Sequence, residues 1–306
     1  MRNINIGGGV LSLPEIVIGC MRISDMPVKD VASLISSALE EGAYFFDHAD
    51  IYGAGRCEEV FGEAMKSAGI PRDKIFLQSK VGIRPGIAFD FTTEHILKSV
   101  DGILKRLNTD RLDILLIHRP DALFEPEQVA AAFDKLEQSG KVIHFGVSNQ
   151  NPRQIDLLRK YVRQPIIFNQ LQLSIAHSGM IDQGIYVNMK SPGSVDHDGG
   201  ILNYCRLNDI TIQAWSPFQY GMFEGIFLRN GKFPELNAVI DKLAAKYDVP
   251  AEAIVVAWIL RHPAKIQVVL GTTKIKRIKD CCKASNFVLT HTEWYDLYQA
   301  AGNELP

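Results

Sequence analysis

The stretch Phe45-Phe46-Asp47-His48-Ala49-Asp50-Ile51-Tyr52-Gly53 passes from an apolar run into a loop that carries an acid and a phenol. Three further apolar runs end in a similar way, at Lys80, at His118 and at Ser148-Asn149. About one strand plus one helix separates each of these segments from the next. In a parallel barrel the strands end at a common mouth, where barrel enzymes place their catalytic residues. The spacing therefore predicts an α/β barrel with these polar side chains gathered at one end.

Strand-like and helical patterns alternate through most of the chain. In Lys29–Glu41 apolar residues recur at helical spacing, and Gly42 follows where glycine commonly ends a helix. Strands that alternate with helices indicate a parallel sheet, and eight such units indicate a closed (β/α)8 TIM barrel. The predicted strands are 16–19, 44–46, 75–78, 112–117, 142–147, 166–168, 210–214 and 266–270. The predicted helices are 29–41, 58–67, 92–107, 126–138, 251–260 and 275–284, with another beginning at Pro152.

Three segments lie outside this alternation. Met1–Leu13 is a glycine-rich lead-in that we predict to form a hairpin closing the bottom of the barrel. Thr290–Ala301 is predicted to be an appended C-terminal helix. His177–Gly200 is rich in glycine and has little periodicity, so we predict a long loop, either a functional lid or binding loop or a tolerated surface insertion. We expect residues 1–306 to form one domain.

The composition limits the class of protein. The chain has 306 residues, 46% of them hydrophobic, and a formal net charge of −2, which argues against nucleic acid or an anionic membrane as an obligate partner. No apolar run reaches the roughly 18 residues that a membrane-spanning helix needs. The N-terminus lacks a cleavable signal pattern, and the five cysteines lack CxxC spacing, so we expect reduced thiols and a cytoplasmic location. No HExxH or Cys/His cluster indicates a metal site.

The side chains at the strand ends are suited to proton transfer. A tyrosine with its unperturbed pKa of about 10 is a weak acid at neutral pH, but a neighbouring ammonium lowers that pKa. Lys80 is predicted to supply the ammonium, and Asp47 to keep Lys80 charged through a buried ion pair. His118 is expected to hydrogen-bond the oxygen that accepts the proton. The four residues together predict that Tyr52 donates a proton to a carbonyl oxygen.

Five segments of the chain resemble the aldo-keto reductase superfamily. They are the Asp47–Tyr52 loop, Lys80, His118, Gly146-Val147-Ser148-Asn149 and Phe168-Asn169-Gln170. The resemblance extends from near Gly19 to about Cys281. The sequence around Asp47 and His118 is similar to that of a bacterial branch of the superfamily. It implies a (β/α)8 barrel that binds NADPH at its C-terminal mouth and reduces aldehydes or ketones. It also implies that Tyr52 is the general acid and that Asp47, Lys80 and His118 complete its catalytic tetrad.

The nicotinamide end of the cofactor needs polar partners and a flat aromatic face. Ser148, Asn149 and Gln170 end two neighbouring strands and are predicted to hydrogen-bond the carboxamide. Trp215 ends the seventh strand and is predicted to stack on the ring, where the family often has tyrosine. The resemblance places further residues along the same groove, namely Gly19, Cys20, Met21, Asp47, Ser216 and Phe218.

The adenosine end is predicted at Gly271-Thr272-Thr273-Lys274 and the helix that follows. A helix N-terminus with hydroxyl caps attracts anions, and Lys274 and Arg277 add positive charge there. These features favour the 2′-phosphate of NADPH over the bare ribose of NADH. Asp280 matches the acidic position that holds the adenine. Gly271 and Cys281 differ from the lysine and the asparagine that the family often has at these positions.

The residues leave three functions open. The first is an NADPH-dependent reductase of a small carbonyl compound. The second is a cofactor-occupied binding or redox-sensing subunit of the same fold with slow turnover. The third is a barrel aldolase in which Lys80 forms a Schiff base, although that leaves the carboxamide partners without a role. Candidates for the substrate wall are Arg22, Phe89, Arg119, Phe218 and 177–200, and the sequence makes no prediction of the oligomeric state.

Overall fold

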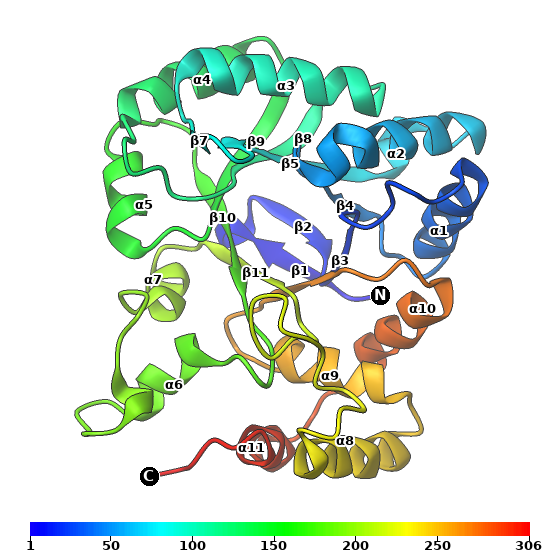
Figure 1. Ribbon diagram of the computed structural model, residues 1–306, viewed down its shortest axis with the longest axis vertical. Coiled ribbons are helices and arrows are strands. Elements are labelled where there is room, and N and C mark those ends of the chain that lie inside the picture. The colour runs from blue at the N-terminus through cyan, green and yellow to red at the C-terminus, as the bar shows by residue number, and fades with distance from the viewer.

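Eight parallel strands close into a barrel in the computed structural model, which describes residues 1–306. The order around the barrel is β10-β11-β12-β3-β4-β5-β8-β9, and Figure 1 shows the helices lying outside the ring of strands. The predicted (β/α)8 barrel is therefore confirmed. Its strands are β3 (Ile16–Gly19), β4 (Phe45–Asp47), β5 (Phe76–Val81), β8 (Leu112–Ile117), β9 (Val142–Ser148), β10 (Ile166–Gln172), β11 (Thr211–Trp215) and β12 (Gln267–Leu270).

Some of the helices begin where local signals indicate. Thr92 accepts a hydrogen bond from the His95 amide at the start of α3, and Asn151 caps α5, whose first residue is Pro152. The helices are α1 (Val28–Glu40), α2 (Arg56–Ser67), α3 (Thr93–Leu107), α4 (Pro126–Gln138), α5 (Pro152–Arg159), α6 (Gly179–Ile185), α7 (Ile201–Leu207), α8 (Pro234–Tyr247), α9 (Ala251–Leu260), α10 (Ile275–Cys282) and α11 (His291–Ala300). None of them combines the length and the apolar character that crossing a membrane requires.

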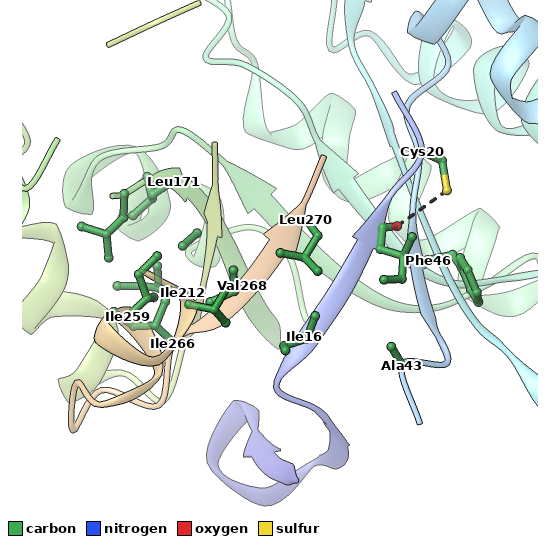
Figure 2. Packing of buried hydrophobic residues seen from close by; sticks show 14 of the residues in the cluster. Ile16, Cys20, Ala43, Phe46, Leu171, Ile212, Ile259, Ile266, Val268 and Leu270 are labelled. Atoms are coloured by element: carbon green, nitrogen blue, oxygen red, sulfur yellow. Dashed lines mark hydrogen bonds between the residues drawn. The ribbon is translucent and has the colours of Figure 1, made fainter. Parts of the chain in front are cut away.

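Apolar side chains alternate between the two faces of the barrel wall. Ile16 of β3 and Val268 and Leu270 of β12 belong to the main core, which the surrounding helices cover; Figure 2 labels these residues together with Ile259 of α9, which belongs to the same core. Val269, between two of them, belongs to a separate cluster inside the barrel. This period of two follows from the pleat of a strand and leaves every second residue available to the interior.

A hairpin closes the bottom of the barrel, as predicted for Met1–Leu13. Its strands β1 (Asn3–Ile6) and β2 (Leu11–Pro14) pair in antiparallel fashion, and Figure 1 shows them at the centre of the ring of strands. Ile6 and Leu13 are buried against the inward side chains of the barrel, among them Phe45 and Ile167. The turn at Gly7 has φ +57, and a Cβ there would lie 2.8 Å from Ile167 Cγ2, so only glycine fits this close approach.

The segment 177–200 is more ordered than its glycine content predicted. It contains α6 and a short 3-10 helix (Pro192–Ser194). The Tyr298 hydroxyl of α11 donates to Asp182 of α6 at 2.8 Å, and Met180 and Ile181 of α6 are buried. The segment therefore packs against the C-terminal helix. A second hairpin, β6 (Ile83–Arg84) with β7 (Ala88–Phe89), follows β5 and was not predicted.

Candidate active site

A cavity of about 620 Å³ opens at the C-terminal ends of the barrel strands. Its wall includes Tyr52 from the short 3-10 helix after β4 (Tyr52–Gly55), His118 after β8 and Trp215 at the end of β11. Such a position is the usual place for ligands in this architecture. The mouth of the barrel therefore holds the candidate active site.

Lys80 lies at the centre of the predicted tetrad. Its side chain is fully buried, and its ammonium donates to Asp47 Oδ2 at 2.7 Å, to the His48 carbonyl at 2.8 Å and to Tyr52 Oη at 3.1 Å. Three donors thus meet three acceptors, which satisfies the buried ammonium. The hydroxyl of Tyr52 accepts from Lys80 and keeps its own proton free for a partner in the cavity.

Burial and charge act in opposite directions on the Tyr52–Lys80 pair. Burial raises the pKa of Tyr52 above its ordinary value, and the lowering effect of the Lys80 ammonium is smaller. The lowering effect predicted for Lys80 is therefore present, but burial of the whole pair, which was not visible in the sequence, outweighs it. Burial also opposes the charge on Lys80, but Asp47 and Tyr52 outweigh it and raise the pKa of Lys80. At neutral pH the phenol is protonated and the amine is charged.

His118 faces Tyr52 as a neutral imidazole. Burial, together with the positive charges of Lys80 and Arg119, holds the pKa of His118 well below its ordinary value. The ring centroids of Tyr52 and His118 lie 6.1 Å apart with an edge-on orientation. A neutral imidazole carries one N–H donor. His118 is therefore able to donate one hydrogen bond to a polar group beside the Tyr52 hydroxyl.

The polar residues predicted for the carboxamide form a connected group at the ends of β9 and β10, next to His118. Asn149 Nδ2 donates to Ser148 Oγ at 2.8 Å, and Ser148 Oγ donates to the Gln170 carbonyl at 3.0 Å. The indole of Trp215 donates to Asn149 Oδ1 at 3.1 Å, which fixes both side chains. Gln170 Nε2 donates to Asp47 Oδ1 at 3.1 Å, so this amide also contacts the tetrad.

Most of the other predicted cofactor residues line the same cavity. They are Gly19, Met21, Ser216, Phe218, Gly271, Thr272, Thr273, Lys274 and Arg277. The N-cap of α10 is Lys274, and no side chain caps the helix. The expected hydroxyl caps are therefore not formed, and the Thr272 hydroxyl accepts from the Lys274 amide instead. The side chains of Lys274 and Arg277 make no ion pair.

Three of the predicted cofactor residues lie outside the cavity wall. Cys20 and Cys281 are buried in the main core, and the carboxylate of Asp280 accepts from Lys276 at 2.7 Å. Among the substrate candidates, Arg22, Arg119 and Phe218 line the cavity, whereas Phe89 and the segment 177–200 do not. The segment 177–200 instead packs near the C-terminus. Periodicity places residues on elements, but it does not reveal how long connections pack.

Residues 15–301 match the model of the Aldo/keto reductase family. The chain belongs to the aldo/keto reductase family. The 6-dehydroglucose reductase of Agrobacterium fabrum is 33% identical over 95% of both chains. Oxidoreductase YdhF of Escherichia coli is 35% identical over 95% of this chain and 94% of its own. An aldo-keto reductase of Bombyx mori in complex with NADP shares the fold, with a TM-score of 0.75 and 19% identity over 100% of this chain and 94% of that chain.

These comparisons make this aldo/keto reductase an oxidoreductase and confirm the family that the strand-end motifs indicated. Sequence reasoning missed a further group of residues in the barrel interior of this aldo/keto reductase. Gln78, Gln213 and Gln267 are fully buried and link the tetrad to the bottom of the barrel through side-chain hydrogen bonds. Their signal was available, because a glutamine within an apolar strand of a buried parallel sheet is unusual.

Proposed function

We propose that this protein reduces the carbonyl group of a small aldehyde or ketone with NADPH, and that Tyr52 donates the proton. One observation carries the proposal. The Tyr52 hydroxyl accepts from the Lys80 ammonium at 3.1 Å on the wall of a cavity, and it therefore directs its own proton toward a ligand. A phenol with a neighbouring ammonium is a suitable general acid, because the phenolate that it becomes is stabilised by the positive charge.

Each of the four tetrad residues has its own role in the proposed reaction. His118 donates its single N–H to the carbonyl oxygen and orients it toward Tyr52. Tyr52 then protonates that oxygen as negative charge develops on it, while Lys80 stabilises the phenolate left behind. Asp47 keeps Lys80 charged and in place. A bound reduced nicotinamide would supply the hydride.

The lining of the cavity offers groups suited to both ends of an NADPH molecule. Ser148, Asn149 and Gln170 present amide and hydroxyl groups for the carboxamide, and Trp215 presents an aromatic face. At the other end, Lys274 and Arg277 are cations without ion-pair partners next to the uncapped N-terminus of α10. Two cations at a helix N-terminus favour a phosphate group over a ribose hydroxyl. The Bombyx mori protein of the same fold is in complex with NADP, which supports this choice.

The environment of Lys80 argues against Schiff-base chemistry. A Schiff base requires a neutral amine that reaches the substrate. The Lys80 ammonium is fully buried, each of its three donors has an acceptor, and Asp47 and Tyr52 raise its pKa against the effect of burial. Lys80 therefore remains a protonated partner of Tyr52 instead of acting as a nucleophile.

The experiment that tests the proposal is Tyr52→Phe. We expect kcat for aldehyde reduction to fall by about 10²- to 10⁴-fold, because the proton donor is lost. Binding of NADPH, measured by quenching of tryptophan fluorescence, is expected to remain. Tyr44→Phe is the matched control, because it removes a hydroxyl that contacts only Asn3 at the barrel bottom. Full turnover by Tyr52→Phe would contradict the role of Tyr52. Tight NADPH binding without turnover by the wild type would instead favour a cofactor-holding subunit.

A further inference from the structure

Four glutamine side chains form a chain of hydrogen bonds inside the barrel. Gln78 comes from β5, and Gln170, Gln213 and Gln267 come from the neighbouring strands β10, β11 and β12. Gln78 Nε2 and Gln170 Nε2 both donate to Gln213 Oε1 at 3.0 Å. Gln213 Nε2 donates to Gln267 Oε1 at 3.1 Å, and Gln267 Nε2 donates to the Pro14 carbonyl of the bottom hairpin at 2.6 Å. The chain of amides therefore crosses the interior beneath the cavity.

The register of the strands explains why these amides meet. Asp47 lies opposite Gln78 in the β4–β5 pair, and Gln213 lies opposite both Gln170 and Gln267 in its own pairs. Gln78 precedes Lys80 by two residues, so both side chains point to the same face of β5. The two strand groups are on opposite sides of the barrel. The glutamines thus meet across the interior and form one polar layer that reaches Asp47 of the tetrad.

Asp47 is the anion on which this layer converges. Its Oδ1 accepts from Gln78 at 2.6 Å and from Gln170 at 3.1 Å, while its Oδ2 accepts from Lys80 at 2.7 Å. Gln213 Oε1 accepts a second hydrogen bond from each of the same two amides. This fixes Gln78 and Gln170 with their N–H groups, and not their oxygens, toward the carboxylate. One oxygen of Asp47 is thereby occupied, and the other is aimed at Lys80.

Burying a layer of amides lowers the stability of the protein, so the presence of the layer calls for a functional reason. Buried amides carry a desolvation cost, and the interior of this type of barrel is usually filled by branched apolar side chains. Each of the four glutamines is at most 3% exposed. We propose that Gln78 and Gln213 are positioning residues that hold Asp47 in the orientation needed to keep Lys80 against Tyr52. This inference rests on the proposed role of Tyr52 as proton donor.

The orientation of Asp47 affects the pH dependence of turnover. Tyr52 must hold its proton to donate it, so reduction slows at alkaline pH as the Tyr52–Lys80 pair loses a proton. The negative charge of Asp47 raises the pKa of both members of the pair. If Asp47 turns away, both pKa values fall, and the alkaline loss of kcat begins at a lower pH.

The other titratable groups around the pair do not produce this shift. They are Cys20, His48, Glu58, His118 and Arg119. Burial raises the pKa of the Cys20 thiol and lowers the pKa of both histidines. These three groups are therefore neutral at the pH where kcat begins to fall on the alkaline side, the alkaline limb of the pH profile. Glu58 is paired with Arg106, and Arg119 keeps its charge. Asp47 is thus the charge whose position the glutamines control.

The experiment compares Gln78→Leu and Gln213→Leu with the wild type, using a simple aldehyde and NADPH from pH 6 to 10. For both variants we expect kcat to fall on the order of tenfold, as for a misplaced catalytic group. We also expect the alkaline limb to move about half to one unit lower, with KM nearly unchanged. Asn169→Leu is the matched control, because it removes an amide that is equally buried in β10 but donates to the Gln150 carbonyl and has no hydrogen bond to Asp47 or to the glutamines. It is expected to keep the wild-type limb.

Gln78→Asn tests the same position in case Gln78→Leu does not fold. It keeps an amide in the barrel but shortens the side chain by one methylene, and it is expected to shift the limb in the same direction as Gln78→Leu. Wild-type limbs in all three glutamine variants would overturn the inference, as would an equal shift in Asn169→Leu. A wild type whose turnover does not depend on Tyr52 would refute the proposed function itself. A Tyr52-dependent wild type with unshifted glutamine variants would refute only the positioning role.

Discussion

Lys274 and Arg277 are the side chains that we expect to decide between the two nicotinamide cofactors. Both are exposed on the cavity rim, and neither has an acidic partner. Replacing either by alanine removes a charged donor to the 2′-phosphate, which is worth about 1.5–3 kcal/mol. We therefore predict that Lys274→Ala and Arg277→Ala each weaken NADPH binding roughly tenfold or more and leave NADH binding nearly unchanged. Fluorescence titration with both cofactors measures the ratio.

A neighbouring lysine on the same helix supplies the control for this prediction. Lys276 donates to Asp280 within α10, so Lys276→Ala also removes one positive charge but not one that faces the cavity. Its ratio of NADH to NADPH dissociation constants is expected to match that of the wild type. A wild type that binds NADH as tightly as NADPH would contradict the assignment.

At the level of single residues, the sequence predicted the tetrad but not what surrounds it. Asp47, Lys80 and His118 were recognisable because each ends an apolar run, and strand ends of a parallel barrel must converge. The effect of Lys80 on the Tyr52 pKa was predicted, but the larger opposing effect of burial was not, because burial of the pair is a property of the folded barrel. Gln213 was missed because its partners come from strands far away in the sequence.

A buried ion pair between α2 and α3 lies next to Gly55, the last residue of the 3-10 helix that carries Tyr52. Arg106 donates to Glu58, whose side chain is fully buried and also accepts from Ser79. Arg106 passes close to Gly55 and Gly102, where a Cβ would lie 2.9 Å from its side chain. Gly55 also has φ +92 at the N-terminus of α2. Small residues therefore make the space through which the guanidinium reaches Glu58.

We predict that Arg106→Met lowers the free energy of unfolding by about 3–5 kcal/mol, because it leaves Glu58 buried without its cation. Urea unfolding followed by circular dichroism measures the loss. The double variant Arg106→Met/Glu58→Gln removes the uncompensated charge and is expected to recover part of the stability. If the single variant unfolds at the same urea concentration as the wild type, the ion pair does not hold this end of the barrel together.

Elements with their own caps and periodicity were predicted well, and elements stabilised by distant partners were not. Helix α3 has Thr92 at its start and one apolar face, so its bounds follow from local signals. Helix α6 has neither a side-chain cap nor a clear pattern. It is held by α11 and by Glu304, which hydrogen-bonds Tyr186 at the end of α6. The β6–β7 hairpin pairs strands of two residues each, too short for alternation to be read.

At the scale of the whole molecule, the buried side chain of His48 makes the free energy of unfolding depend on pH. His48 is fully buried beside Phe61, with ring centroids 4.6 Å apart, and neither ring nitrogen has a hydrogen-bond partner. Burial, with a smaller effect from Lys80, lowers the pKa of His48 to about 3. In the unfolded chain this pKa is about 6.5. Between these values the unfolded state binds a proton that the folded state does not, so stability falls as the pH falls below 6.5.

Several other groups act over the same range, among them His118, whose pKa burial holds well below its ordinary value, but they do not obscure the effect of His48. Burial also lowers the pKa of His262 to about 4, which adds to the loss of stability in acid. The carboxyl of Asp50 acts in the opposite direction, since burial and Glu58 raise its pKa to about 7 and the folded state therefore takes up a proton first. All of these groups are present in the wild type and in a His48 variant, so their contributions cancel in a comparison of the two.

We therefore predict that His48→Leu makes the protein less sensitive to acid. Through His48, each pH unit below 6.5 lowers the free energy of unfolding of the wild type by up to about 1.4 kcal/mol. The variant lacks this loss, so between pH 7 and pH 5 the difference in free energy of unfolding should shift by about 2 kcal/mol in favour of the variant. Urea unfolding at the two pH values measures this difference, whatever the cost of the substitution itself at pH 7. A stability difference that stays constant from pH 7 to pH 5 would show that His48 is protonated in the folded barrel. The ring would then need a hydrogen-bond acceptor that its apolar surroundings do not provide.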